Sequence, residues 1–203
     1  MPSPNIYPVV LPVPETDREL TGRQKVTALS ERARHALRIS VEKSGLALSD
    51  LPKNEDGVPM PVDGHYWSLT HKIAYVGGVV SETIVGMDIE KIRPCSPPLY
   101  GKTATAEEWA LFPSNPLSLF FRYWTAKESV LKASGTGVKD LLKCRVVTLE
   151  DDTHLTIDYR DEIWLIEHIF FDGHIASVTK NGAHVNWVMA GRRDEITPSG
   201  ALP

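Results

Sequence analysis

The chain has 203 residues, of which 42% are hydrophobic and 24% are charged, and its formal net charge is -4. This is an ordinary composition for a globular protein, and the chain is long enough to bury a core. It excludes the basic excess that is typical of proteins whose main task is to bind nucleic acid.

The N-terminal segment, residues 1–15, is predicted to be extended, as an edge strand, because prolines interrupt its apolar run. It has no charged region followed by a long apolar stretch, so we expect neither a signal peptide nor a membrane span. The two cysteines, Cys95 and Cys144, form no paired motif. A reducing, cytoplasmic environment is therefore expected.

The next segments predict one helix, one loop and three strands. The helix covers residues 28–44, with Ser30 as its N-cap and Gly45 as its stop. A loop rich in Pro, Gly and Asp follows, "LPKNEDGVPMPVDG". The strands are predicted at "HYWSLTH", "KIAYVGGVV" and "ETIVGMDIEKI".

The second part of the chain begins after "RPCSPP", which interrupts regular structure. A helical stretch is predicted from Ala104, and a second helix, "FFRYWTAKESVLKASGTG" (120–137), ends on a glycine. Five strand-like segments follow: "CRVVTL", "HLTIDY", "IWLIEHIF", "HIASVTK" and "AHVNWVMA". Residues 191–203 are expected to form a disordered tail.

Two internal similarities occur in the same order in both parts of the chain. The segment "KSGLALSDLPK" is similar to "ASGTGVKDLLK", and "DGHYWSLTHK" (63–72) is similar to "DGHIASVTKN" (172–181). They indicate a duplication. We therefore predict an α+β fold made of a pseudo-twofold pair of related halves, residues 16–97 and 98–190, each a small antiparallel sheet with a packed helix. A ligand is expected at the seam between the halves.

The first candidate site is the strand "VGMDIE". Alternation on a strand puts Gly86, Asp88 and Glu90 on one face, where the glycine would leave room for a ligand. Two neighbouring carboxylates repel each other unless a cation lies between them, and oxygen ligands suit magnesium or manganese. The alternative is a strand end with solvated acids.

The second candidate is Glu128, which lies on the apolar stripe of its helix between Trp124 and Leu131. A structural salt bridge to Lys132, one turn further on, is the alternative interpretation. Together with the two carboxylates of the strand and with Lys127, this set would suit phosphoryl or phosphodiester chemistry.

The remaining candidates are cationic. His71 ends a predicted strand, where a histidine is more often structural. Arg34 and Arg38 lie on one face of the first helix, and an ordinary solvated face is the alternative.

The two main motifs resemble those of the 4'-phosphopantetheinyl transferases of the larger, Sfp type. That family has a strand of the form (I/V)-G-(I/V)-D-(I/V)-E and a helix of the form W-(S/T)-x-K-E-(A/S)-x-x-K. This chain has "VGMDIE" at 85–90 and "WTAKESVLK" at 124–132, about 40 residues apart. The "DGVPMPVDGHYWSLTH" segment is similar to a third family region, and the resemblance covers roughly residues 28–140.

The resemblance implies roles for the acidic residues and one lysine. Asp88, Glu90 and Glu128 would bind Mg2+, with Mn2+ as a substitute. Glu128 would also be the general base for the acceptor serine. Lys132 would contact the diphosphate of coenzyme A and stabilise the leaving group.

It also implies further contacts to coenzyme A. Lys127 would support phosphate binding, Thr70 and His71 would lie near the phosphates, and Arg34 and Arg38 would belong to a basic helix.

This chain departs from the family pattern at three positions. Val58 stands where the family has the lysine of "G-K-P", so Lys53 is a candidate replacement. Met87 replaces a branched residue, and Lys72 follows the histidine where a serine is frequent.

The implied activity is transfer of phosphopantetheine from coenzyme A to a serine of an apo carrier protein, with release of adenosine 3',5'-bisphosphate. A metal-dependent nuclease and a non-catalytic coenzyme A-binding protein of the same fold are the alternatives. We expect an acyl or peptidyl carrier domain as partner, no nucleic acid or membrane partner, and a monomer in the cytoplasm.

Overall fold

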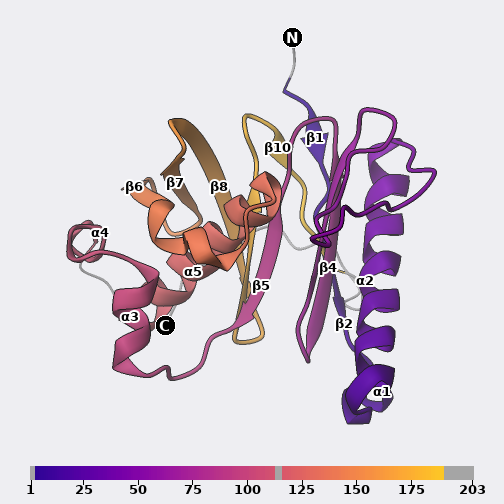
Figure 1. Ribbon diagram of the computed structural model, residues 1–203, viewed down its shortest axis with the longest axis horizontal. Helices are drawn as coiled ribbons and strands as arrows, with labels where there is room; N and C mark the ends of the chain where they lie inside the picture. The colour runs from indigo at the N-terminus through magenta and orange to yellow at the C-terminus, as the bar shows by residue number, and fades with distance from the viewer. Residues whose placement is uncertain (1–2, 113–115, 190–203) are drawn as a thin grey trace.

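The computed structural model describes residues 3–112 and 116–189, in which antiparallel sheets are packed against helices (Figure 1). The α+β prediction is confirmed. Within the described ranges, no helix has the length and apolarity needed to cross a bilayer. The predicted tail, residues 191–203, lies outside the described residues.

The first main sheet has four strands, in the order β11 (Val188–Met189), β2 (Val9–Pro12), β4 (Tyr75–Ser81) and β3 (Tyr66–His71). A short parallel pair, β1 (Asn5–Ile6) and β10 (His184–Val185), lies beside it. Of the predicted N-terminal segment, β1 and β2 are extended, whereas Glu15 begins a helix. Strand β2 is not an edge strand, because β11 and β4 pair with its two sides.

The long helix α2 (Gly22–Ser44) covers one face of this sheet, and α1 (Glu15–Glu19) precedes it. It ends as predicted at Gly45, whose φ of 67° is left-handed. The predicted start was wrong: the N-cap is Thr21, not Ser30. The first two turns have no buried residue before Leu29, so the apolar period that marks a helix in sequence is missing there.

The second sheet has five strands, in the order β5 (Met87–Lys91), β9 (His174–Thr179), β8 (Glu162–Phe171), β7 (His154–Tyr159) and β6 (Arg145–Leu149). Helix α5 (Pro116–Ser134) packs on β5 and β9. Three short helices flank it: α3 (Pro97–Thr103), α4 (Ala106–Ala110) and the 3-10 helix η1 (Val138–Lys143). Helix α3 was not predicted: the prolines of "RPCSPP" indicate a break, but proline is also favourable in the first turn of a helix, where Pro97 and Pro98 lie.

The sheets interleave across the predicted boundary between residues 97 and 98. Strand β5 precedes that boundary but pairs with β9, whereas β10 and β11 follow it but pair with β1 and β2. The division into two halves therefore stays a prediction.

Strand β5 is held on both sides by hydroxyl groups from the two similar segments. Ser68 of β3 accepts a hydrogen bond from the Met87 amide at 3.1 Å. Thr179 of β9 accepts one from the Gly86 amide at 2.9 Å. Buried amides need partners, and these hydroxyls supply them where the two sheets meet. The strand that carries the acidic motif is thereby placed at the junction of the two sheets.

Candidate active site

A close approach between β5 and α5 brings the two sequence motifs together. A Cβ atom at Gly86 would lie 1.9 Å from the Ser129 carbonyl oxygen and 2.7 Å from the Ala133 amide nitrogen. The expectation that Gly86 leaves room for a ligand is therefore wrong, because the helix backbone occupies that space. The glycine instead lets α5 lie directly on β5, and this contact places Lys132 beside Asp88.

Asp88 lies at the centre of the site and is 2% exposed. Its Oδ1 accepts hydrogen bonds from Thr70 Oγ1 at 3.0 Å and from Lys132 Nζ at 2.7 Å. Lys132 also donates to the Met87 carbonyl oxygen at 3.1 Å. The second oxygen, Oδ2, is buried and has no hydrogen-bond partner among the described residues. A buried carboxylate oxygen without a donor is an acceptor suited to a ligand or cation.

Glu90 lies two residues further along β5 and pairs with Lys72 from the end of β3. The Lys72 ammonium nitrogen is 2.6 Å from Glu90 Oε1. Burial would lower the pKa of Lys72, but the negative charges of Asp88 and Glu90 outweigh this effect, so its pKa is raised. Lys72 is therefore a positively charged partner of the acidic cluster at neutral pH.

Glu128 comes from α5 and is half-buried beside the same cluster. Burial and the negative charge of Asp88 raise its pKa, although Lys132 and Lys72 act in the opposite direction. A carboxylate whose pKa is raised in this way is a better proton acceptor than a free glutamate. Its side chain therefore has the properties of a general base.

His71 ends β3 at the exposed rim of the site. Desolvation lowers its pKa, and the nearby charges of Lys132, Lys72 and Lys53 lower it further. Three lysine charges thus act on His71, beside the acidic cluster, and we call this surface the positive rim of the site. An anionic group such as phosphate would be attracted there.

A pocket of about 230 Å³ opens next to these groups. Its lining includes Lys53, Val58, Trp67, Glu128, Leu131 and Lys132. The loop that carries Lys53 and Val58 is held by a hydrogen bond from Trp67 Nε1 to the Met60 carbonyl oxygen at 2.9 Å. The bridge between Lys53 and Pro59 folds this loop into a hairpin, so Lys53 lies at the same pocket as Val58.

Lys127 does not reach this cluster, and the structure corrects its predicted role in phosphate binding. Its side chain is fully buried, 2.6 Å from Glu108 Oε1, and it donates to the Thr103 carbonyl oxygen at 2.8 Å. Burial lowers the pKa of Lys127, and Glu108 opposes that effect. Neighbouring residues on a helix point about 100° apart, so Lys127 faces the interior although Glu128 faces the pocket.

The structure does not bring Arg34 and Arg38 to the site. Both are exposed on α2, whose buried residues face the first sheet, and α2 lies on the far side of β4 from β5 and α5 (Figure 1). Among the described residues, no hydrogen bond or ion pair is found that joins either arginine to the acidic cluster. Their role in binding coenzyme A stays a prediction.

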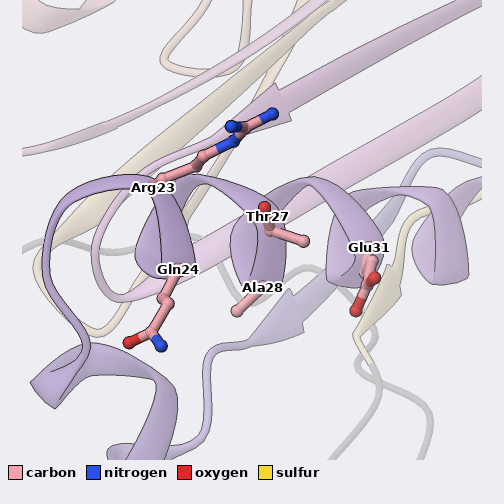
Figure 2. Close-up of a pocket in the computed structure, with 5 residues that line it drawn as sticks. All are labelled: Arg23, Gln24, Thr27, Ala28 and Glu31. Atoms are coloured by element: carbon pink, nitrogen blue, oxygen red, sulfur yellow. The ribbon is translucent and has the colours of Figure 1, made fainter.

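A second hollow lies along the same helix. Figure 2 shows that its labelled side chains, Arg23, Gln24, Thr27, Ala28 and Glu31, all come from α2. In the described part of the chain, its lining comes from this helix alone, so we do not consider it a candidate site.

The three predicted metal ligands offer the oxygen donors that a divalent cation prefers, but their side chains do not form a complete metal-binding group. Within residues 3–112 and 116–189, no group of three His, Cys, Asp or Glu side chains is close enough to hold a metal ion. Lysine ammonium groups contact Asp88 Oδ1 and Glu90 Oε1. The free Oδ2 of Asp88 and the oxygen-only donor set fit Mg2+ or Mn2+. Metal binding by these residues stays a prediction.

Sequence reasoning missed the partners of two acidic residues, Glu108 and Glu90. Glu108 forms a capping box with Thr105, accepts from the Val146 amide and pairs with Lys127. The "TAEE" spacing was a visible signal of that cap. The pairing of Lys72 with Glu90 had no such signal, because it joins residues of two different sheets.

The sequence matches known proteins of one family. The sequence model of the 4'-phosphopantetheinyl transferase superfamily matches residues 84–185, which include both motifs. A 4'-phosphopantetheinyl transferase from Bacillus subtilis is 25% identical over 151 residues, which cover 72% of this chain and 65% of that protein.

Two other relatives share shorter stretches. The 4'-phosphopantetheinyl transferase psf-1 from Bacillus pumilus is 28% identical over 53% of this chain and 48% of its own length. The 4'-phosphopantetheinyl transferase HetI from a Nostoc species is 40% identical over 28% of this chain and 27% of its own length. These alignments thus span less than two thirds of each curated relative.

Proposed function

Because the chain belongs to the 4'-phosphopantetheinyl transferase superfamily, we propose that it transfers phosphopantetheine from coenzyme A to a serine of an apo carrier protein. The second product is adenosine 3',5'-bisphosphate. One observation carries this proposal: Asp88, Glu128 and Lys132, from the two motifs, converge beside one pocket. Asp88 and Glu128 supply two carboxylates, of which Glu128 can also accept a proton, and Lys132 supplies a cation. Transfer at a phosphorus atom needs these groups.

Glu128 and Lys132 have different roles in the proposed reaction. Glu128 accepts the proton of the serine hydroxyl, so that the oxygen can attack the β-phosphorus of coenzyme A, to which the phosphopantetheine arm is attached. The bond between that phosphorus and the bridging oxygen breaks as the new bond to serine forms. Lys132 stabilises the negative charge that develops on the leaving phosphate.

Asp88, Glu90 and Glu128 are the residues that would hold a divalent cation, which when bound would neutralise diphosphate charge as a Lewis acid. Thr70 hydrogen-bonds Asp88 and so orients its carboxylate. His71 and Lys53 lie at the positive rim, where they would face the phosphates of coenzyme A. Lys53, which shares the pocket with Val58, is our candidate for the contact that the family lysine makes.

The two alternatives are less well supported. Many metal-dependent nucleases place a glutamate and a lysine two residues apart on one strand. Here Glu128 and Lys132 are four apart on a helix, and the net charge is -4. A protein that only binds coenzyme A would not need to keep the carboxylates together with Glu128 and Lys132.

A direct assay tests the proposal. The protein is incubated with coenzyme A, Mg2+ and a panel of apo acyl and peptidyl carrier proteins, and each carrier is weighed by mass spectrometry. We expect one carrier to gain the mass of a single phosphopantetheine group. Plasmid cleavage under the same conditions would instead support the nuclease. Binding of coenzyme A with no transfer to any carrier would support the non-catalytic alternative.

A further inference from the structure

Lys72 is a cation of the site that neither of the two motifs contains. It follows β3 directly, and its backbone amide donates to the Tyr75 carbonyl oxygen at 2.8 Å, which holds the start of the turn in place. The side chain reaches across to the second sheet, where Nζ lies 2.6 Å from Glu90 Oε1. The Lys72 side chain is 37% exposed, whereas that of Glu90 is 14% exposed. The ammonium group is thus on the solvent side of the pair.

The two lysines that contact the acidic strand are held differently. Lys132 has two acceptors, Asp88 Oδ1 and the Met87 carbonyl oxygen. Among the described residues, the Lys72 ammonium has one hydrogen-bond acceptor, Glu90, and its side chain is more exposed than that of Lys132. The Lys72 ammonium is on the solvent side of its pair, so it can exchange this acceptor at a lower cost than the more firmly held Lys132 can.

The Glu90 carboxylate can pair with either of two cations, the Lys72 ammonium or a divalent metal ion. It lies two residues from Asp88 on the same strand, and in the structure its charge is offset by Lys72. A divalent cation that bound Glu90 would compete with the Lys72 ammonium for the same carboxylate. The displaced ammonium would stay at the positive rim with Lys53 and Lys132, where a phosphate group would be its natural partner.

We propose that Lys72 is an exchangeable counter-ion, which pairs with Glu90 until a divalent cation takes that carboxylate and then turns to a phosphate group of the co-substrate. This inference rests on the proposed function for the identity of the phosphate ligand. It makes Lys72 a positioning residue that couples the two ligands. Binding of the cation frees the Lys72 ammonium for phosphate, and binding of phosphate frees the Glu90 carboxylate for the cation. Each ligand therefore raises the affinity for the other, by the same factor in either order.

The coupling gives two effects of opposite sign when Lys72 is neutralised. In Lys72→Met the chain length of the side chain is nearly kept, but Glu90 loses its internal counter-ion. The cation should then bind more tightly, and a phosphate ligand should bind more weakly. A merely structural role for Lys72 would weaken both, because a damaged site holds neither ligand well.

The test uses the full chain and two probes, Mn2+ and adenosine 3',5'-bisphosphate. Mn2+ binding is followed by the loss of the free-ion EPR signal, and bisphosphate binding by calorimetry with and without Mg2+. For the original chain we expect Mg2+ to tighten bisphosphate binding about 5- to 10-fold. For Lys72→Met we expect this factor to fall to about 1–2, and Mn2+ to bind about 3-fold more tightly. The factor expected for the original chain lies within the usual range for coupled sites, about 5- to 150-fold.

Lys91→Met is the matched control, because Lys91 follows Glu90 on β5, is exposed and has no role in the site. It should behave as the original chain does, and Lys72→Arg should retain the coupling. The inference is overturned if Lys72→Met binds Mn2+ as the original chain does or more weakly, if the effect of Mg2+ on the bisphosphate is unchanged, or if the original chain binds neither probe. These binding results are independent of the transfer assay, so a failure of the proposed function would be recognised separately.

Discussion

Lys132 Nζ lies 2.7 Å from Asp88 Oδ1, and this ion pair joins the two motifs through residues that are 44 positions apart in the chain. The pair exists because α5 lies on β5 at Gly86, where a side chain would collide with the helix backbone. The geometry of the site therefore depends on a packing contact as much as on the charged residues, and both can be tested separately.

Gly86→Ala tests the packing contact. The new methyl group would overlap the Ser129 carbonyl oxygen at 1.9 Å, so α5 must move away from β5. We expect a loss of stability of about 1–3 kcal/mol or more, as for other overpacked cores, measured by urea denaturation. Gly101→Ala is the control, since nothing lies within 4 Å of a Cβ atom there and the residue is in α3. Equal stability of the two variants would contradict the contact.

Glu128→Gln tests the general base. We expect transfer to a carrier to fall by at least ~100-fold, the lower end of what general-base catalysis contributes, while the circular dichroism spectrum is unchanged. Glu128→Asp, which keeps the carboxylate but shortens the side chain, should retain part of the activity. A fully active Glu128→Gln would show that another group takes the serine proton.

The pKa of Glu128 also predicts how stability depends on pH. Because its folded pKa is raised, the folded state holds the proton more tightly than the unfolded chain does. Stability therefore falls as the pH rises from the unfolded value, about 4.3, through the higher folded pKa. In buffer with EDTA at pH 7.5, Glu128→Gln should melt about 1–4 °C above the original chain. Below pH 4 the two should melt together, and a lower melting temperature at pH 7.5 would contradict this interpretation.

Asp88→Asn tests the centre of the cluster. The substitution keeps the size of the side chain but leaves the half-buried Lys132 ammonium without its charged acceptor. We expect a loss of about 1–3 kcal/mol in urea denaturation. Mg2+ at millimolar concentration should raise the melting temperature of the original chain and not that of the variant. A similar Mg2+ response in both would place the cation elsewhere.

Lys127→Met separates a structural lysine from a phosphate-binding one. Removing the ammonium leaves Glu108 buried without its ion partner, which typically costs about 3–5 kcal/mol. At 10 °C, where the folded form still predominates, the affinity for adenosine 3',5'-bisphosphate should equal that of the original chain. Weaker binding by the folded variant would restore the role that the motif alone suggested for Lys127.

Local sequence patterns predicted most of the elements correctly. Strands β3, β5, β6, β7 and β9 lie within the predicted segments, because alternation reflects which face of a strand is buried. Strands β4 and β8 extend by one residue beyond theirs at one or both ends, and helix α5 begins at Pro116 and ends at Ser134 rather than covering 120–137. The predictions failed where that signal is missing, as in the exposed first turns of α2 and in the proline-initiated α3. Boundaries depend on caps and exposure more than on the apolar period.

The sequence by itself determined the chemical inventory of this protein: the carboxylates Asp88, Glu90 and Glu128, the family to which they point, and the α+β class. It could not determine which charged groups meet. Lys127 and Lys132 belong to one motif, yet the first is buried against Glu108 and the second contacts Asp88. In each pair the two residues come from different elements. Only the packing of α5 against the rest of the fold, which sets the direction of its side chains, therefore decided which groups meet in the site.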